Sequence, residues 1–174
     1  MLIVDQHAAH ERIQYEKIKH RLEHNEKGLD GQKLLFPLVI DLPKHLQKII
    51  PDFIEEYREM FVKVGFKIKV FSGNSIIVEE IPKDLLEWKK GDILVEIFKQ
   101  IEEEFSPDGD FRDTLAKSYA CHASIKLHQK LSKKEMLELI NRLFACKNPF
   151  FCPHGRPTII EITFEELKKR FKRI

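Results

Sequence analysis

Several side chains that bind divalent metal ions in other proteins lie close together at the start of the sequence. They are Asp5, His7, His10, Glu11 and Glu16. On a helix, His7 and Glu11 share one face, where an imidazole and a carboxylate can bind one ion, and Asp5 can reach the same place. Glu16 points about 140° further round the helix, so we expect it to pair with Arg12 instead. An exposed charged helix is the alternative interpretation.

A second group of possible ligands lies near the C-terminal end. Cys152-Pro153-His154 places a thiolate and an imidazole two residues apart, and both are ligands that zinc prefers. Gly155 permits a tight turn, and Arg156 adds a fixed positive charge that suits a phosphate. A turn around a buried cysteine is the alternative.

The remaining cysteines are weaker candidates. Cys121, beside His122, and Cys146 both lie in predicted helices, where a single cysteine is usually part of the core. Nothing around Cys146 indicates a ligand. Taken together, the Asp, His, Glu and Cys side chains suffice for two ions that share a carboxylate, and mixed O, N and S donors suit Zn²⁺ or Mn²⁺ better than Ca²⁺. Paired ions often serve phosphodiester cleavage, although composition does not select DNA as the substrate.

Hydrophobic spacing, turn residues and caps predict an α+β fold. A strand end at Leu2–Val4 leads into a helix from His7 to about Glu26 that Asp5 could cap, and 28–31 is a turn. Further strands are expected over 33–41, 66–71, 75–81 and 158–162, and helices over 43–64, 92–105, 111–128, 132–146 and 163 to about 170, with 82–90 irregular. Capping boxes open the last two helices at Ser132 and Thr163. The order of elements predicts two lobes, with 32–105 inserted between 1–31 and 106–174.

Composition excludes several classes of protein. Hydrophobic residues make up 43% and charged residues 33% of the chain, which is typical of a folded globular protein. The net charge of +2 favours no partner by itself, although 168–173 could form a local basic patch. There is no apolar run of roughly 20 residues and no signal peptide, so we expect a cytoplasmic protein without a membrane contact. An odd number of cysteines excludes a complete disulfide framework. Because the first residues have the pattern of a strand end, we expect the chain to be part of a longer protein.

The possible ligands fall into motifs that resemble those of one family. Asp5-Gln6-His7-Ala8, followed by Glu11 and Glu16, resembles the endonuclease motif of MutL C-terminal domains. Ala120-Cys121 resembles the second motif of that family, residues 152–157 the third, and Phe171-Lys172-Arg173 the fourth. The motifs occur in the family's order and extend over the whole chain.

The resemblance implies a bacterial, nucleoid-associated homodimer that nicks one strand of duplex DNA in mismatch repair. Residues 1–31 and 106–174 would form the dimerisation and endonuclease lobe, and 32–105 a regulatory lobe. Mn²⁺ would activate the site, and Zn²⁺ would be structural or regulatory. The implied metal ligands are His7, Glu11, Cys121, Cys152 and His154, with Asp5 and Glu11 catalytic and with Arg156 and Arg173 facing phosphate or bracing the site. His122 departs from the family, which has Arg or Lys there.

A further match concerns partners. The segment Gln32-Lys33-Leu34-Leu35-Phe36-Pro37 resembles the motif with which MutL endonucleases bind the replication sliding clamp. An ordinary strand is the alternative. The family also implies contact with the mismatch-recognition protein MutS through the full-length protein. A non-catalytic dimerisation and DNA-tethering module is the main rival function, whereas a zinc deaminase is excluded because the Pro-Cys-x-x-Cys motif is absent.

Overall fold

The computed structural model describes residues 1–24, 31–83, 85, 91–126 and 128–173. Helices and strands are mixed along the chain, which confirms the predicted α+β class. The chain forms two compact units, one of residues 1–16 and 124–174 and the other of residues 17–123. These boundaries differ from those of the predicted lobes, and the roles assigned to the lobes stay predictions. The predicted turn over 28–31 and the irregular segment 82–90 lie largely outside the described residues.

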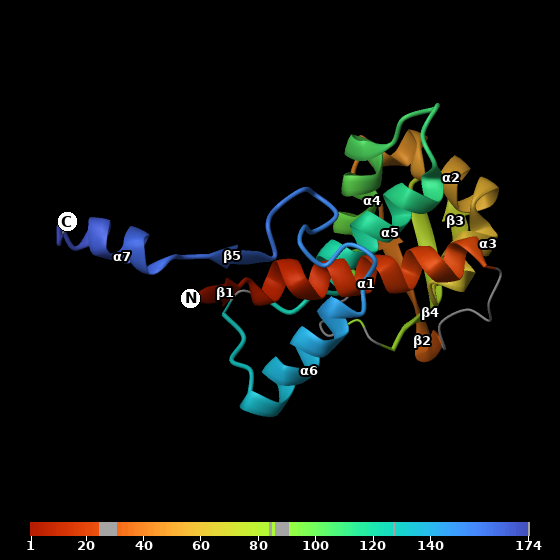
Figure 1. Ribbon diagram of the computed structural model, residues 1–174. Coiled ribbons are helices and arrows are strands. Elements are labelled where there is room, and N and C mark those ends of the chain that lie inside the picture. Colours follow the sequence, from red (N-terminus) through yellow and green to blue (C-terminus); the bar gives the residue numbers. More distant parts are fainter. Residues whose placement is uncertain (25–30, 84, 86–90, 127, 174) are drawn as a thin grey trace. The chain divides into compact units, whose positions relative to one another are not determined.

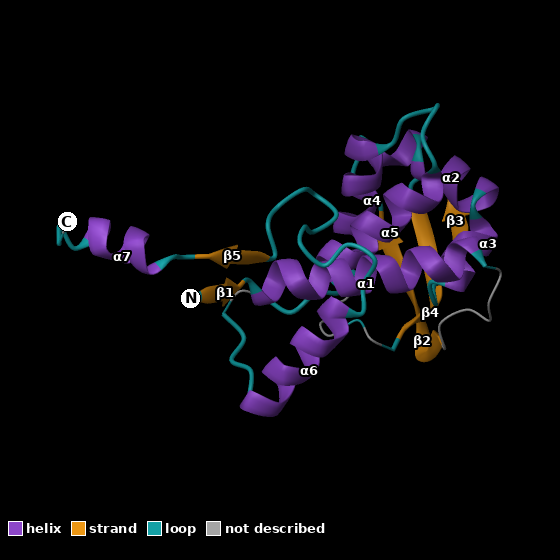
Figure 2. Cartoon of the chain, viewed as in Figure 1, coloured by secondary structure: helices purple, strands orange, loops and turns teal. Residues whose placement is uncertain are grey.

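The second unit contains a three-stranded antiparallel sheet in the order β2-β4-β3 (Figure 2). β3 (Lys67–Ser72) and β4 (Ser75–Pro82) form the predicted hairpin, and β2 (Gly31–Asp41) pairs with the other edge of β4. In the central strand, Ile76 and Val78 are fully buried. The alternation of apolar residues therefore predicted the hairpin correctly, because one face of this sheet is covered.

The helix predicted over 43–64 is wrong as a single element. The structure has a 3-10 helix at Leu46–Lys48, α2 (Ile50–Glu56) and α3 (Arg58–Lys63). Pro51 lies in the first turn of α2, where its missing N–H costs nothing, but it could not lie inside a longer helix. At Tyr57 the backbone leaves helical geometry, and the ring stacks on Phe111 with centroids 3.7 Å apart.

Two longer helices complete the second unit. α4 (Asp92–Glu104) and α5 (Phe111–His122) lie side by side (Figure 1), and α4 buries Leu94, Ile97, Phe98 and Ile101. α5 ends at His122, six residues before the predicted end at His128. The backbone of Ile125 is bound by two histidines of α1 (Gln6–Glu23), so the chain cannot continue as a helix there.

The first unit is built around a two-stranded antiparallel sheet of β1 (Leu2–Val4) and β5 (Ile159–Glu161). α1 follows β1 directly, and its residues up to Glu16 belong to this unit. The core consists of Ala9 and Ile13 from α1 with Leu139 and Leu143 from α6 (Lys133–Phe144), joined by Val4, Leu131, Cys146 and Ile159. The structural role predicted for Cys146 is thus confirmed.

Capping boxes begin two helices of this unit. Ser132 and Glu135 cap α6, and Thr163 and Glu166 cap α7 (Phe164–Arg170), both as predicted. No residue of α7 is buried. None of the described helices is long and apolar enough to cross a membrane.

Candidate metal centre

Asp5 joins the sheet of the first unit to α1. Its Oδ1 accepts hydrogen bonds from the backbone N–H groups of His7 and Ala8, at 2.8 and 3.0 Å, and its own N–H donates to the carbonyl of Thr158. The predicted capping role of Asp5 is therefore confirmed. Because only one carboxylate oxygen accepts these bonds, the other can act elsewhere.

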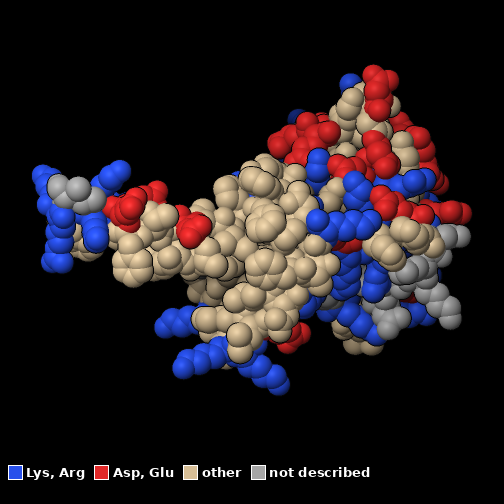
Figure 3. Space-filling model, viewed as in Figure 1, with Lys and Arg blue, Asp and Glu red and all other residues tan. Residues whose placement is uncertain are grey.

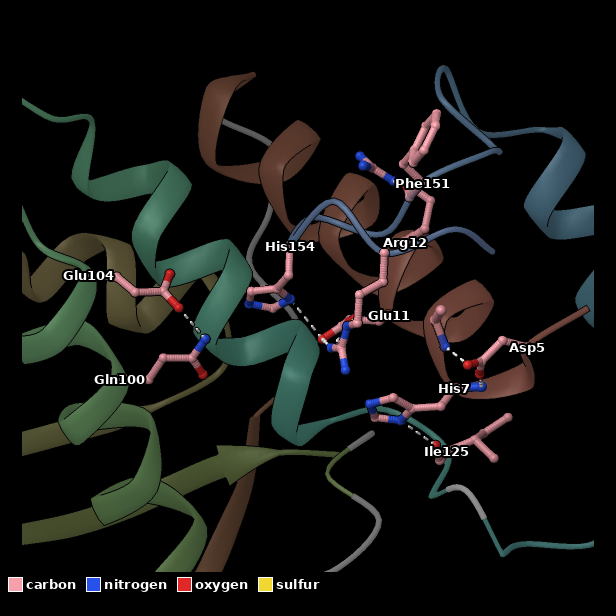
Figure 4. A network of polar contacts seen from close by, with 11 residues as sticks. Asp5, His7, Glu11, Arg12, Gln100, Glu104, Ile125, Phe151 and His154 are labelled. Atoms are coloured by element: carbon pink, nitrogen blue, oxygen red, sulfur yellow. Dashed lines mark hydrogen bonds and ion pairs between the residues drawn. The ribbon is translucent and has the colours of Figure 1, made fainter. Parts of the chain in front are cut away.

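Two histidines of α1 bind the backbone of Ile125, and Figure 4 shows the contact of His7. Nδ1 of His7 lies 2.8 Å from the Ile125 carbonyl oxygen, and the Ile125 N–H donates to Nδ1 of His10 at 3.3 Å. Nδ1 of His7 must carry a proton to donate, and in the neutral ring the lone pair is then on Nε2. A backbone carbonyl fixes many metal-binding histidines in this way. His10 positions the same segment, a role that its sequence neighbourhood did not reveal.

The loop before β5 is held against α1 at several points. The Glu16 carboxylate accepts hydrogen bonds from the backbone of Lys147 and Asn148, at 2.7 and 3.1 Å. Arg12 donates from Nε to the carbonyl of Phe151 at 2.6 Å and pairs with Glu16 at 3.6 Å. The predicted Arg12–Glu16 pair is thus confirmed. The contacts that Arg12 and Glu16 make with the loop could not be predicted, because they join residues more than 130 positions apart.

A tight turn aims the side chains of this loop. The N–H of Cys152 donates to the Arg156 carbonyl, and the N–H of Gly155 donates back to the Cys152 carbonyl. Gly155 has a φ of 81°, a left-handed conformation that L-residues rarely adopt. The reversal lets Cys152, His154 and Arg156 approach one carboxylate on α1, that of Glu11.

Three possible metal ligands meet around Glu11. One donor atom each from Glu11, Cys152 and His154 lies within 4.8 Å of the others. Glu11 and Cys152 are buried, and His154 lies at the surface. Nδ1 of His154 is 3.0 Å from Oε1 of Glu11 (Figure 4), and Nη2 of Arg156 lies 3.2 to 3.3 Å from both carboxylate oxygens.

The surroundings of Glu11 favour its ionised form. Burial by itself raises the pKa of this carboxyl group. Hydrogen bonds from His154 and Cys152, together with the positive charges of His154 and Arg156, outweigh the burial, and the pKa is lowered from its ordinary value of 4.5. A buried, ionised carboxylate beside a thiol and an imidazole has the donor types of a Zn²⁺ or Mn²⁺ site.

The other predicted site residues lie elsewhere. His7 lies on α1, as Glu11 does, but it is outside the group of mutually close donor atoms. Cys121 lies in the last turn of α5, in the second unit, so its role as a ligand stays a prediction. Arg173 follows α7, and its guanidinium lies 5.9 Å from the Phe171 ring centroid. The predicted contact of Arg173 with phosphate stays a prediction.

Comparisons with known proteins agree with these motifs. The family described as the MutL C-terminal dimerisation domain matches residues 1–131. DNA mismatch repair proteins MutL from Chloroherpeton thalassium and Chlorobaculum tepidum are 40% and 39% identical over 99% of this chain. The MutL protein of Clostridium tetani is 39% identical over the full chain. This chain belongs to the MutL C-terminal dimerisation domain family. It spans only 26 to 27% of the length of these relatives.

Proposed function

We propose that this domain is a metal-dependent endonuclease that nicks one strand of duplex DNA in mismatch repair. The observation that carries the proposal is the buried carboxylate of Glu11, with Cys152 and His154 as possible co-ligands within 4.8 Å. Burying the charge of Glu11 is costly unless the carboxylate binds a partner, and dimerisation by itself gives no reason to bury it. Mn²⁺ is the proposed activating ion, and Zn²⁺ is proposed as a structural or regulatory ion.

The residues would divide the chemistry as follows. Glu11, Cys152 and His154 would hold one ion. Further ligands would be His7, through its Nε2 lone pair, and Cys121. A bound divalent ion supplies a nucleophile at neutral pH and stabilises the leaving oxygen. The oxygen of Asp5 that does not cap α1 would accept a proton or orient water. Arg156 and Arg173 would contact DNA phosphates.

We assign homodimerisation to the first unit, because its surface carries many exposed apolar side chains. Figure 3 shows a broad uncharged face over β1, β5 and the loop that precedes β5. Exposed apolar residues of this unit include Leu2, Ile3, Met136, Leu137, Phe144, Phe150, Phe151, Ile160 and Phe164. A groove of about 530 Å³ beside the sheet is lined by Ile3, Val4, Asp5, Gln6, Pro157, Thr158 and Ile160. Patches of this kind mark protein–protein contacts.

The sliding-clamp motif is proposed as a partner site on β2. The strand alternative is correct for its backbone, yet the pairing of β2 with β4 is interrupted between Lys33 and Leu38. Leu35 and Phe36 are 89% and 79% exposed. An extended segment with exposed apolar side chains can enter a hydrophobic pocket on a partner, here the replication sliding clamp. Contact with MutS is proposed only for the full-length protein.

The test is conversion of supercoiled plasmid to open circle in Mn²⁺ by this chain and by Glu11→Gln. The amide keeps the shape of the side chain and removes its charge. Nicking by the parent, reduced at least about a hundredfold in the variant, supports the nuclease. If both proteins are folded dimers and neither nicks, the alternative of a dimerisation and DNA-tethering module is favoured. Equal nicking by both would place the activity outside this site.

A further inference from the structure

Arg156 already occupies the carboxylate that the proposed metal ion would need. One nitrogen, Nη2, lies 3.3 Å from Oε1 and 3.2 Å from Oε2 of Glu11, so both oxygens face the same cation. The Glu11 side chain is fully buried, whereas 57% of the Arg156 side chain is exposed. The pair therefore consists of a fixed, enclosed anion and a cation at the surface with access to water.

A guanidinium group cannot stay in place when a metal ion binds the same oxygens. It has no lone pair and keeps its charge at every physiological pH, so it is no ligand and it repels a divalent cation. Without any cation, however, the buried carboxylate would be strongly disfavoured. The backbone of Arg156 is fixed by the turn, since its carbonyl accepts the Cys152 N–H at 2.8 Å. Only the side chain needs to move to exchange one cation for another.

We propose that Arg156 is a displaceable counter-cation that balances Glu11 in the metal-free domain and swings into solvent when a divalent ion binds. The inference rests on the proposed metal-dependent function. Displacement makes metal binding weaker than the ligands alone would allow. It also frees a guanidinium group beside the loaded site, where it can bind a phosphodiester. Metal loading and DNA binding would thereby strengthen each other, because coupling between two ligands is reciprocal.

The test measures Zn²⁺ and Mn²⁺ affinity by titration calorimetry at low ionic strength, in this chain and its variants. Arg156→Gln removes the competing charge, and we expect it to bind each metal about three- to tenfold more tightly than the parent. Arg156→Lys keeps the charge and should bind close to the parent. Arg142→Gln removes a charge from the exposed side of α6 in the same unit and is the matched control, with no change expected.

Weaker metal binding by Arg156→Gln would overturn the inference, because it would mean that Arg156 braces the ligands. Equal binding would overturn it as well. Either result leaves the nuclease proposal intact if the parent nicks plasmid. Conversely, suppose that Arg156→Gln binds metal more tightly than the parent and that the parent does not nick plasmid. This result supports the exchange of one cation for another at Glu11 and rejects the nuclease. A parent that binds neither metal contradicts both.

A second measurement follows the freed guanidinium. Fluorescence anisotropy with a labelled DNA duplex should show that Mn²⁺ strengthens DNA binding of the parent several-fold, a step that Arg156→Gln lacks. If Mn²⁺ strengthens binding equally in both proteins, Arg156 does not carry the coupling. In that case the released side chain has no role toward phosphate.

Discussion

The Oδ1 atom of Asp5 lies 2.8 Å from the backbone nitrogen of His7, so the carboxylate that caps α1 also stands at the start of the proposed site. A loss of activity on changing Asp5 could therefore reflect a weakened helix or a lost catalytic group. Asparagine caps helices as well as aspartate does, but it carries no charge. The pair of substitutions to Asn and Ala separates the two roles.

We expect Asp5→Asn to keep the stability of the parent and to reduce plasmid nicking about a hundredfold or more, because proton transfer needs the carboxylate. Asp5→Ala should lose the same activity and also about 1 kcal/mol of the free energy of unfolding. Asp110→Ala is the matched control, since Asp110 caps α5 in the same way through the Arg112 N–H. It should lose stability alone. An Asp5→Asn variant that still nicks plasmid would mean that Asp5 serves only as the cap of α1.

Glu11 should make the stability of the metal-free domain depend on pH. Its pKa is lowered in the folded protein, so the stabilisation is fully present above the ordinary value of 4.5 and is lost as the pH falls through the lower folded value. Urea unfolding in the presence of a chelator, from pH 7 to pH 3, should show a steeper loss of stability for the parent than for Glu11→Gln. Parallel curves would mean that the Glu11 pairs are not stabilising.

Arg12 should set metal affinity without being a ligand. Its Nε donates to the Phe151 carbonyl, next to Cys152, and holds the loop against α1. Lysine keeps the charge but cannot reproduce this geometry, so Arg12→Lys should weaken Zn²⁺ binding about ten- to hundredfold, as loss of an outer contact does in known metal sites. Arg21→Lys, in the last turn of the same helix, is the control and should bind as the parent does. Unchanged affinity in Arg12→Lys would show that the loop holds its shape alone.

Phe36 and Leu35 should be needed for clamp binding and not for folding. Because they are largely exposed, the double substitution to Ala should change stability by less than about 0.5 kcal/mol. It should abolish binding to an immobilised bacterial sliding clamp. Phe71→Ala is the matched control, since Phe71 is 64% exposed on β3 of the same sheet. If the Phe71 variant loses clamp binding and the Leu35/Phe36 double variant keeps it, the contact lies on the other edge strand, β3.

Cys146 should be slow to react with thiol reagents. Burial, then the nearby carboxylate of Glu16, raises the pKa of its thiol to about 11. At pH 8 roughly one thiol in a thousand would be ionised, against about one in ten at the ordinary value of 9.0, so alkylation should be about a hundredfold slower than for an ordinary thiol. Peptide mapping by mass spectrometry, with the urea-unfolded chain as reference, measures the rate. Rapid labelling of the folded protein would contradict the packing around Cys146.

The sequence predicted the fold best where the signal was local. Both capping boxes and the β3–β4 hairpin depend on residues a few positions apart, and all three are present. The single helix predicted over 43–64 was wrong, and Pro51, which lies inside this range, was a local signal against it. The end of α5 could not be predicted, because it depends on hydrogen bonds between the backbone of Ile125 and two histidines more than 100 positions earlier.

In the candidate site, too, the residue types and motifs were predicted and the contacts between distant segments were not. Residue types and motif order pointed to Glu11, Cys152 and His154, and the structure brings these three together. The supports in Arg12, Glu16 and His10 have no signature in sequence, because each acts through a backbone group of a distant segment. The resemblance implied that Arg156 faces phosphate or braces the site, but its contact with both oxygens of Glu11 depends on the handedness of one turn and has no signature in the sequence.

The turn at Gly155 has a consequence for chirality. A Cβ at this position would meet no atom within 4 Å, so the surroundings have room for a side chain. The restriction comes from the φ of 81° alone, which costs an L-residue roughly 1 to 2 kcal/mol. A D-alanine introduced by chemical synthesis prefers this region and should fit, whereas L-alanine should displace His154 and Arg156 from Glu11. The candidate centre would thus accept a larger residue of the mirror-image hand and reject the ordinary one.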